Sequence, residues 1–286
     1  MKILPIAFDS LGTRSMATYV ETEDVKILLD PGVSLAPTRY GLSPHPIEIE
    51  RMNTHWSEIK KYAEMSDVLA VTHYHYDHHD PNEPEIYRDK IALIKHPTQN
   101  INYSQKKRAK YFLDQIEGLP KTLEYSDGRE FTFGDTQIRF SAPVFHGTSS
   151  KLGYVTEVSI VEGEDRFLFT SDVEGPSIDE QTNFIIQENP RTIFLDGPMT
   201  YMLGFRYSKL SLEKSVENMT KIINETIVKD FVVDHHFLRD LEWKKRIENV
   251  FEAAEDQDVR ILTAAEFLGQ ENDLLEARRK ELYQKQ

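Results

Sequence analysis

Short runs of apolar residues, separated by polar or turn-forming residues, set the pattern of the first third of the chain. The runs are four to six residues long and rich in β-branched side chains, which is typical of strands. Helical spacing occurs in Trp56, Ile59 and Ala63 and again over Gln105–Glu117. The pattern therefore predicts two helices and five strands, the strands over residues 3–8, 16–21, 25–29, 68–71 and 91–94.

The segment from Val33 to Met52 has no hydrophobic period and contains several prolines. We expect a long loop here. Long loops in compact domains are usually functional, so this one is a candidate wall of a pocket.

The hydrophobic period changes to two between Thr122 and Asp172, with turn signals such as Asp127-Gly128 between the segments. This pattern predicts a meander of antiparallel strands. The last third of the chain alternates between helical and strand patterns. We expect one domain over residues 1–286, because no linker-like segment interrupts the chain. The predicted elements are helices over 178–187, 212–223 and 247–254, strands over 193–195, 231–233 and 260–262, and a charged terminal helix over 274–283.

The polar ends of several predicted strands carry histidines and aspartates. Thr-His-Tyr-His-Tyr-Asp-His follows the strand 68–71 directly, and His146, Asp172 and His235 each follow a later apolar strand. Ligands and catalytic groups gather at such strand ends, because the strand holds the following loop rigidly. Burying these groups together without partners costs several kcal/mol each, and a divalent cation offsets that cost. The sequence therefore predicts a metal site.

Composition narrows the chemistry of that site. There is no cysteine, so every ligand is nitrogen or oxygen. Lys and Arg number 34 against 48 Asp and Glu, and the net charge of -14 works against broad nucleic-acid binding. No segment approaches the roughly 18 apolar residues of a membrane helix, so we expect a cytoplasmic protein without a membrane partner.

Counting donors divides the ligands between two ions. We expect a first ion at His73, His75 and His146, a second at Asp77, His78 and His235, and Asp172 as a bridge. Imidazole and carboxylate suit Zn²⁺, and without thiolate they also accept Mn²⁺ or iron. Three protein ligands and a bridge leave room for a water or hydroxide.

The run from Thr72 to His78 resembles the signature of the metallo-β-lactamase superfamily. Later features follow in the superfamily's order: His146 before Gly147, Asp172 in Thr-Ser-Asp, and a histidine after Phe-Val-Val-Asp. The resemblance covers essentially the whole chain and implies the same ligands in a four-layer αββα sandwich of the mixed α/β (α+β) class. Within the superfamily, the Asp9-Ser10-Leu11-Gly12 opening and Asp196-Gly197-Pro198 make the chain similar to a prokaryotic, largely archaeal group of metal-dependent hydrolases. That similarity brings no substrate with it.

Three further residues are expected to support the ligands. Asp30, in an Asp-Pro-Gly turn, would hold backbone amides of the ligand loop, as the aspartate at this position does in the superfamily. His79 would orient a ligand. The doubled His235-His236 leaves two candidates for the last ligand; we favour His235, which follows the strand directly, and expect His236 to face the opposite side or to support the site.

The expected activity is that of a dinuclear metal-dependent hydrolase acting on a small molecule. A metal-bridging hydroxide would attack an ester, lactone, thioester or phosphodiester, with Asp77 holding the second ion and orienting the nucleophile. The alternatives are a nuclease or phosphodiesterase acting on nucleic acid and a non-catalytic metal or ligand sensor. A di-iron redox protein is disfavoured, because flavodiiron enzymes resemble His-x-Glu-x-Asp-His and this chain has His75 in place of the Glu. The oligomeric state is left open.

Other side chains near these motifs receive simpler interpretations. The basic run on the helix 105–117 predicts a solvated face, with an anion-binding patch as the alternative. Ser211 is expected to cap a helix. Four residues are candidates for the pocket wall, and ordinary packing is the alternative for each: Tyr74, Tyr76, Tyr201 and Arg206.

Overall fold

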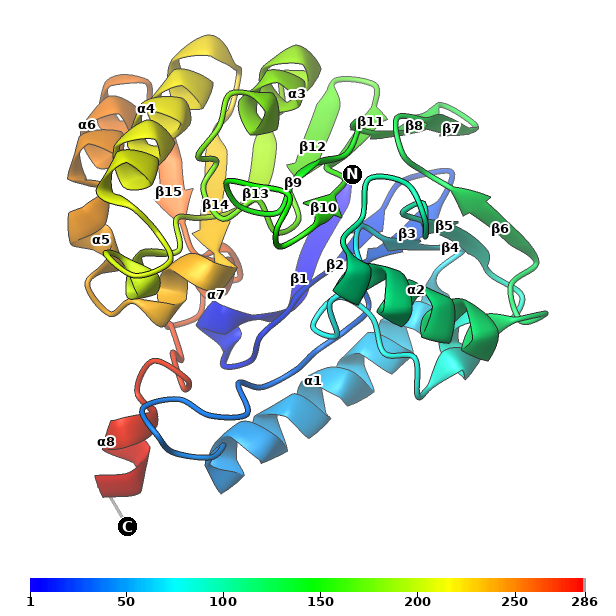
Figure 1. Cartoon of the computed structure of the whole chain (residues 1–286). Helices are drawn as coiled ribbons and strands as arrows, with labels where there is room; N and C mark the ends of the chain where they lie inside the picture. Colours follow the sequence, from blue (N-terminus) through cyan, green and yellow to red (C-terminus); the bar gives the residue numbers. More distant parts are fainter. Residues whose placement is uncertain (285–286) are drawn as a thin grey trace.

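Two β-sheets packed face to face form the centre of the computed structural model, which describes residues 1–284 (Figure 1). The first sheet begins with antiparallel pairs and continues with parallel ones. Its six strands, in spatial order, are β1 (Lys2–Phe8), β2 (Met16–Glu21), β3 (Lys26–Leu29), β4 (Val68–Val71), β5 (Ile91–Ile94) and β6 (Thr122–Tyr125).

The second sheet has seven strands and the same division into antiparallel and parallel pairs. In spatial order they are β15 (Arg260–Leu262), β14 (Asp230–Asp234), β13 (Thr192–Asp196), β12 (Asp165–Phe169), β11 (Val158–Glu162), β8 (Thr136–Phe140) and β7 (Glu130–Phe133). A separate two-stranded hairpin pairs β9 (Val144–Phe145) with β10 (Tyr154–Val155).

Helices cover the outer face of each sheet, which gives the four layers that the resemblance implies. On the first sheet, α1 (Pro46–Met65) and α2 (Tyr103–Ile116) bury Ile59 and Phe112 against the strands. On the second, apolar residues of the covering helices pack on β13 and β14. These helices are α3 (Glu180–Glu188), α4 (Lys209–Glu225) and α6 (Glu248–Asp256). The short helices are α5 (Trp243–Arg246), α7 (Ala264–Phe267) and α8 (Arg279–Gln284).

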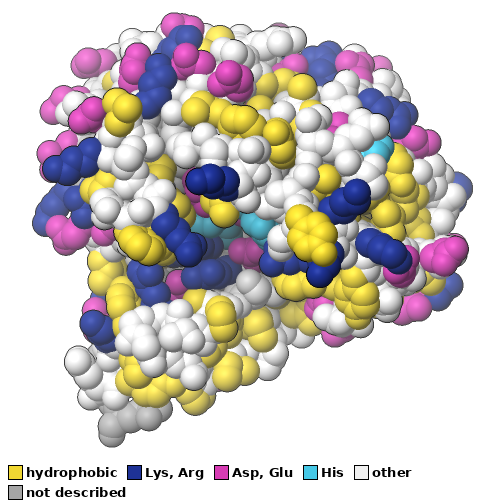
Figure 2. All heavy atoms as spheres, in the orientation of Figure 1, with side chains coloured by type: hydrophobic (Ala, Val, Ile, Leu, Met, Phe, Trp, Pro, Cys, Tyr) yellow, Lys and Arg dark blue, Asp and Glu magenta, His cyan; other side chains and the backbone are white. Residues whose placement is uncertain are grey.

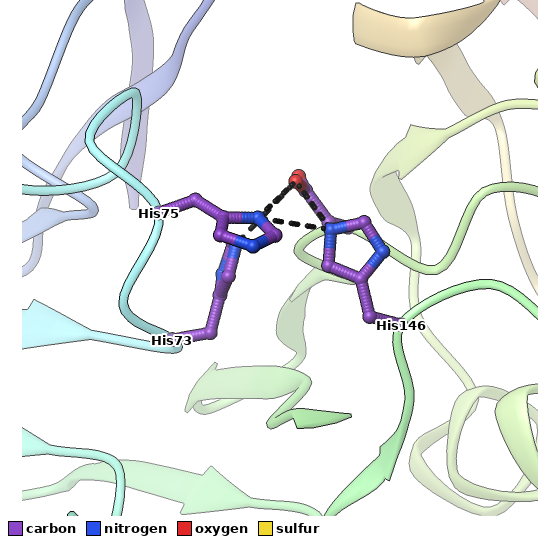
Figure 3. A group of neighbouring side chains, drawn as sticks. His73, His75 and His146 are labelled. Atoms are coloured by element: carbon purple, nitrogen blue, oxygen red, sulfur yellow. Dashed lines mark hydrogen bonds and ion pairs between the residues drawn. The ribbon is translucent and has the colours of Figure 1, made fainter. Parts of the chain in front are cut away.

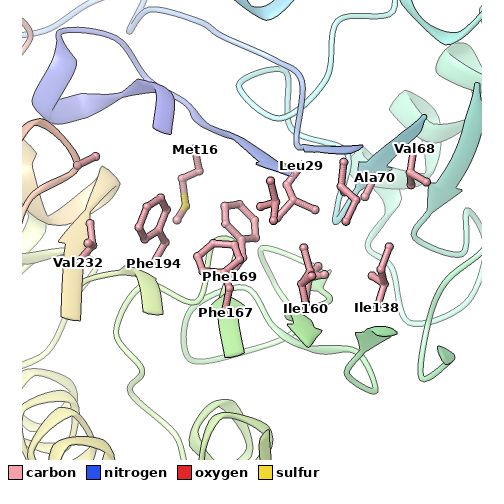
Figure 4. Packing of buried hydrophobic residues seen from close by; sticks show 14 of the residues in the cluster. Met16, Leu29, Val68, Ala70, Ile138, Ile160, Phe167, Phe169, Phe194 and Val232 are labelled. Atoms are coloured by element: carbon pink, nitrogen blue, oxygen red, sulfur yellow. The ribbon is translucent and has the colours of Figure 1, made fainter. Parts of the chain in front are cut away.

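The main apolar core lies between the two sheets (Figure 4). Met16 and Leu29 of the first sheet lie opposite Phe169 and Phe194 of the second, all fully buried. Each such side chain contributes roughly 1.5–3 kcal/mol on burial. This core fixes the two sheets together and so brings the carboxyl ends of their parallel strands to one edge.

The loop predicted over residues 33–52 is too long, because α1 begins at Pro46. His45 caps this helix: Glu48 accepts a hydrogen bond from the His45 backbone, and Nδ1 of His45 accepts one from Ile47. The sequence pattern does not predict the first turn, because Ile47 and Ile49 are exposed there and leave no apolar stripe. A buried ion pair between Glu48 and Arg279 ties this turn to α8.

The predicted meander is wrong in two places. Strand β6 joins the first sheet, parallel to β5, because α2 forms the crossover between them. Within the same range, β9 and β10 pair with each other in the separate hairpin and are not strands of the second sheet. A hydrophobic period of two residues identifies a strand but not the strand with which it pairs. The sheet to which each strand belongs is therefore not predictable from this pattern.

Two helix ends also differ from expectation. Ser208, not Ser211, caps α4, and its hydroxyl accepts a hydrogen bond from the Ser211 backbone at 2.9 Å. The terminal helix begins only at Arg279. Residues 275–278 before it form turns, and Leu274 and Ala277 are buried against the helices of the second sheet. Within residues 1–284, every helix is too short or too polar to cross a membrane.

Candidate metal centre

The histidine-rich loop follows β4 and is held by the loop after β3. Asp30 accepts hydrogen bonds from the backbone N–H and the hydroxyl of Thr72, at 2.7 and 2.6 Å. Gly32 lies so close that an added Cβ would stand 2.2 Å from the backbone nitrogen of His79. Only a residue without a side chain permits this approach, so the loop that carries the histidines is fixed by backbone packing as well as by hydrogen bonds.

A first donor group consists of His73, His75 and His146 around one oxygen of Asp172. Figure 3 shows these imidazoles pointing toward one another, two from the loop after β4 and one from the end of β9. Oδ2 of Asp172 lies 3.4 Å from Nε2 of His73, 3.2 Å from Nε2 of His146 and 4.0 Å from Nδ1 of His75. These four side chains can converge on one cation.

A second donor group, Asp77, His78 and His235, lies around the other oxygen of Asp172. Oδ1 is 2.9 Å from Nε2 of His78 and 3.3 Å from Nε2 of His235. Oδ2 of Asp77 lies 3.8 Å from the same nitrogen of His235. The carboxylate of Asp172 therefore faces one donor group with each oxygen.

Several of these donor atoms are buried without a hydrogen-bond partner among the described residues: Nε2 of His73, Nε2 of His78 and Oδ1 of Asp172. Buried polar atoms are normally satisfied, and leaving one unpaired costs about 1–3 kcal/mol. Clustered orphan nitrogen and oxygen atoms are what a divalent cation would satisfy. The donor set thus fits one or more metal ions.

The ring nitrogens that face away from the donor atoms are held by further side chains. Nδ1 of His78 lies 2.7 Å from Asp30, Nδ1 of His235 lies 2.8 Å from Asp9, and Nδ1 of His73 lies 3.2 Å from the Ser171 hydroxyl. For His146 the neighbour is Glu174, at 3.5 Å. Such partners fix the orientation and tautomer of metal-binding histidines.

No protein-family model matches the chain. A relative from Korarchaeum cryptofilum, described as a UPF0282 protein, is 56% identical over 285 residues, which cover 99% of this chain and 95% of the relative. The chain belongs to the UPF0282 family. Its relatives are mostly archaeal, as the resemblance predicted.

The UPF0282 chain shares its fold with solved structures of low sequence identity. An isothiocyanate hydrolase from Delia radicum gut bacteria has a TM-score of 0.54 at 14% identity, over 92% of this chain and 95% of that one. The metallo-beta-lactamase fold protein YhfI from Bacillus subtilis has a TM-score of 0.50 at 15% identity, over 91% of this chain and 95% of that one. The predicted metallo-β-lactamase fold is confirmed.

The electrostatics of the UPF0282 site favour positive charge between the two carboxylates that flank His78. Burial lowers the pKa of His78, but Asp172 and Asp30 outweigh it and raise that pKa to about 10. Burial likewise opposes charge on His235, yet Asp172 and Asp9 raise its pKa well above the usual value. The carboxylates around the second donor group therefore stabilise positive charge there.

The expected supporting residues lie around this site. Asp30 and His79 both hold the ligand loop, with Nδ1 of His79 3.0 Å from the carbonyl oxygen of His75. His235 faces Asp172, whereas Nδ1 of His236 lies 3.0 Å from Asp196. The alternative that His236 faces the opposite side is wrong, because it lies within the same cluster as Asp172 and His235.

Sequence reasoning missed two members of the site. Asp9 and Glu174 are not among the predicted site residues, although both lie against histidines of the donor groups. Glu174 stands two residues after Asp172 and carries no local signal. Asp9 follows β1 at its carboxyl end, which is the signal that could have marked it.

The predicted pocket-wall residues divide into two kinds. Tyr74 is fully buried and donates its hydroxyl to the Lys95 carbonyl, so it belongs to the core. Tyr76 is exposed, with the Arg108 guanidinium 5.1 Å from its ring centre. Tyr201 is partly exposed and Arg206 is exposed. Of the basic run, Lys106, Lys107 and Lys110 are exposed, as expected of a solvated face.

Proposed function

We propose that this UPF0282 protein is a metal-dependent hydrolase with two divalent ions, one in each donor group. Imidazole and carboxylate donors suit Zn²⁺ best and also accept Mn²⁺ or iron. The observation that carries the proposal is the orientation of Asp172, whose two oxygens face separate groups of buried donors. A site for a single ion would need only one of these groups.

Two ions, when bound, would lower the pKa of a water between them to about 7 and polarise the carbonyl or phosphoryl group of the substrate. The protein's own part is to hold and orient. His73, His75 and His146 would supply the first donor group, and Asp172 would join it to the second.

Asp77 has the role of the catalytic carboxylate in this proposal. Burial raises its pKa, but His78, His235 and His75 outweigh that effect and hold the pKa below its usual value. The side chain is therefore an anion at neutral pH. From its place beside His235 it can contribute to the second donor group and accept a hydrogen bond from the attacking water, which orients the nucleophile.

The substrate class we propose is a small ester, lactone, thioester or phosphodiester. The net charge of -14 disfavours long nucleic acids. The test incubates metal-loaded protein with a panel of substrates and measures hydrolysis. The panel contains each of these bonds and a single-stranded oligonucleotide. Turnover of a small substrate supports the proposal. Selective cleavage of the oligonucleotide would favour the nuclease, and bound metal without any turnover would favour a sensor.

A further inference from the structure

Three arginine side chains gather next to His235 and share two carboxylates. Nε of Arg239 donates to Asp9 at 2.8 Å, and Arg14 donates from Nε and Nη2 to Glu276 at 2.6 and 2.7 Å. Arg39 is the third, with its Nε 3.9 Å from Glu276. Asp9 also pairs with His235, so this cluster adjoins the second donor group directly.

The cluster carries one positive charge more than its carboxylates neutralise. Arg14 takes both oxygens of Glu276 and Arg239 takes one oxygen of Asp9, which leaves Arg39 without a hydrogen-bonded carboxylate among residues 1–284. The Nε atom of Arg39 is buried without a hydrogen-bond partner in that part of the chain. A partly buried guanidinium in this state attracts an anion.

The backbone holds Arg39 in place at some cost. Arg39 and Leu42 exchange two backbone hydrogen bonds of 2.9 Å across a tight turn, in which Tyr40 has a φ of 57°. Left-handed backbone in a residue with a side chain is strained and needs support. That support includes the Tyr40 hydroxyl, which donates to the Ala277 carbonyl, and Nη2 of Arg39, which donates to the Arg239 carbonyl at 3.0 Å.

Tyr201 forms a common surface with Arg39 and Arg239. The guanidinium carbons of Arg39 and Arg239 lie 4.7 and 5.8 Å from its ring centre. Behind them, Arg14, Arg239 and Glu276 line a cavity of about 10 Å³, which is too small for more than a water. An anion must therefore approach from the open side, where Arg39 and Tyr201 are partly exposed. Figure 2 shows histidines at the bottom of a hollow bordered by Lys and Arg side chains.

We propose that Arg39, Arg239 and Tyr201 bind an anionic oxygen group of the substrate, a carboxylate or a phosphate, beside the second donor group. The guanidinium fork matches either anion, and Arg239, with Nη2 3.4 Å from Nε2 of His235, links the anion site to the reacting centre. The hydrolase's substrate is then an anionic small molecule. That the anion belongs to a substrate rests on the proposed function. That these residues bind an anion does not.

The first test measures binding without turnover. Titration calorimetry of metal-loaded protein with inorganic phosphate and with succinate compares the wild type with Arg39→Met and Arg39→Lys. We expect Arg39→Met to weaken binding of at least one anion by roughly tenfold or more and Arg39→Lys to weaken it less, because lysine keeps the charge but not the fork. Whichever anion responds identifies the group. Equal affinities in all three proteins would overturn the proposal, and Arg39→Lys decides the matter if Arg39→Met fails to fold.

Arg129→Met is the matched control. Its guanidinium also lies over an aromatic ring, 4.8 Å from the centre of Phe131, and pairs with Glu124, while its contacts include no residue of either donor group. We expect this variant to bind both anions as the wild type does. An equal loss of binding in Arg129→Met and Arg39→Met would mean that only the protein's general charge matters, which contradicts the proposal.

The second test uses three esters that share a reacting bond and differ at the far end, which is neutral, a carboxylate or a phosphate. We expect kcat/KM to favour an anionic ester, and Arg39→Met to remove that preference by lowering kcat/KM more for the anionic ester than for the neutral one. Loss of activity toward all three esters alike would overturn the anion site. If no ester is hydrolysed but anion binding still depends on Arg39, the proposed function fails and the anion site stands.

Discussion

Nε2 of His78 lies 2.9 Å from Oδ1 of Asp172, yet the two atoms do not form a hydrogen bond. Both atoms are buried, and neither has a hydrogen-bond partner among residues 1–284. The opposite nitrogen of His78 is already paired with Asp30 at 2.7 Å. This relationship is what a cation between His78 and Asp172 would produce, and the predictions on the site follow from it.

Replacing Asp77 with Asn should abolish turnover of the small-molecule panel and leave the fold intact. The substitution keeps the shape of the side chain but removes the negative charge that we assign to the second donor group and to the orientation of the attacking water. Steady-state kinetics measure the first effect, and circular dichroism with thermal unfolding measures the second. Full activity in Asp77→Asn would rule out the catalytic role.

Replacing Asp30 with Asn should weaken metal binding by about 10–100-fold, the usual effect of losing a carboxylate that orients a metal-binding histidine. Asp30 holds both His78 and Thr72, so the ligand loop loses two contacts at once. Competition with a chromophoric chelator measures the affinity.

The control for that variant is Asp80→Asn. Asp80 belongs to the same loop but bonds only Asn82 through its side chain in the described structure. Its replacement should leave the affinity unchanged. Equal affinities in Asp30→Asn and the wild type would show that Asp30 has no part in orienting the ligands.

Much of this site was predictable from the sequence because each ligand follows the strand that positions it. The apolar run before His73 and the one before His235 mark strand ends locally, and parallel strands bring such ends to one edge. The partners of those histidines were not predictable in the same way. Asp9 and His235 are 226 residues apart, and their contact depends on how the two sheets pack.

The errors in the fold have a similar origin. A capping residue such as His45 and a first turn with exposed Ile47 and Ile49 leave no apolar period, so the sequence pattern predicts loop where α1 begins. The sheet that β6 joins is set by the crossover through α2. Local pattern gives the type of an element more reliably than its ends or its neighbours.

Replacing Gly32 with Ala should weaken metal binding, because the new Cβ would stand 2.2 Å from the backbone of His79 and must displace the loop that carries His78. Backbone shifts of this kind typically cost about 1–3 kcal/mol. Thermal unfolding measures the loss of stability, and the chelator assay measures the loss of metal affinity.

Gly163→Ala separates loss of stability from loss of the site. Gly163 has a φ of 59° and open space around it, so alanine there strains the backbone of a distant turn by roughly 1 kcal/mol. We expect lower stability with unchanged metal affinity. If Gly32→Ala also kept its metal affinity, the close approach of Gly32 would not be needed for the site.

The stability of the fold should fall as the pH drops from about 6.5 to about 4, in part because of His55. Burial, with Arg51 adding to it, lowers the pKa of His55 from 6.5 to about 4. The unfolded chain therefore takes up a proton in this window before the folded chain does. A difference of two to three pKa units corresponds to about 3 kcal/mol, fully present above pH 6.5 and lost toward pH 4.

His55→Asn removes this titration while keeping an acceptor for the Thr13 hydroxyl, which lies 2.7 Å from Nδ1 of His55. Denaturant unfolding at several pH values should show a shallower loss of stability for the variant than for the wild type between pH 6.5 and 4. Parallel curves for the two proteins would mean that His55 does not titrate in this way.

The central claim, that Asp172 joins two metal-binding donor groups, is tested most directly by the metal content of the protein. Purified chain is loaded with Zn²⁺, freed of excess ion by gel filtration and measured by elemental analysis against protein concentration. The account predicts two ions per chain in the wild type and fewer in Asp172→Asn, which offers an oxygen to only one group. A wild-type content of one ion or none would contradict it.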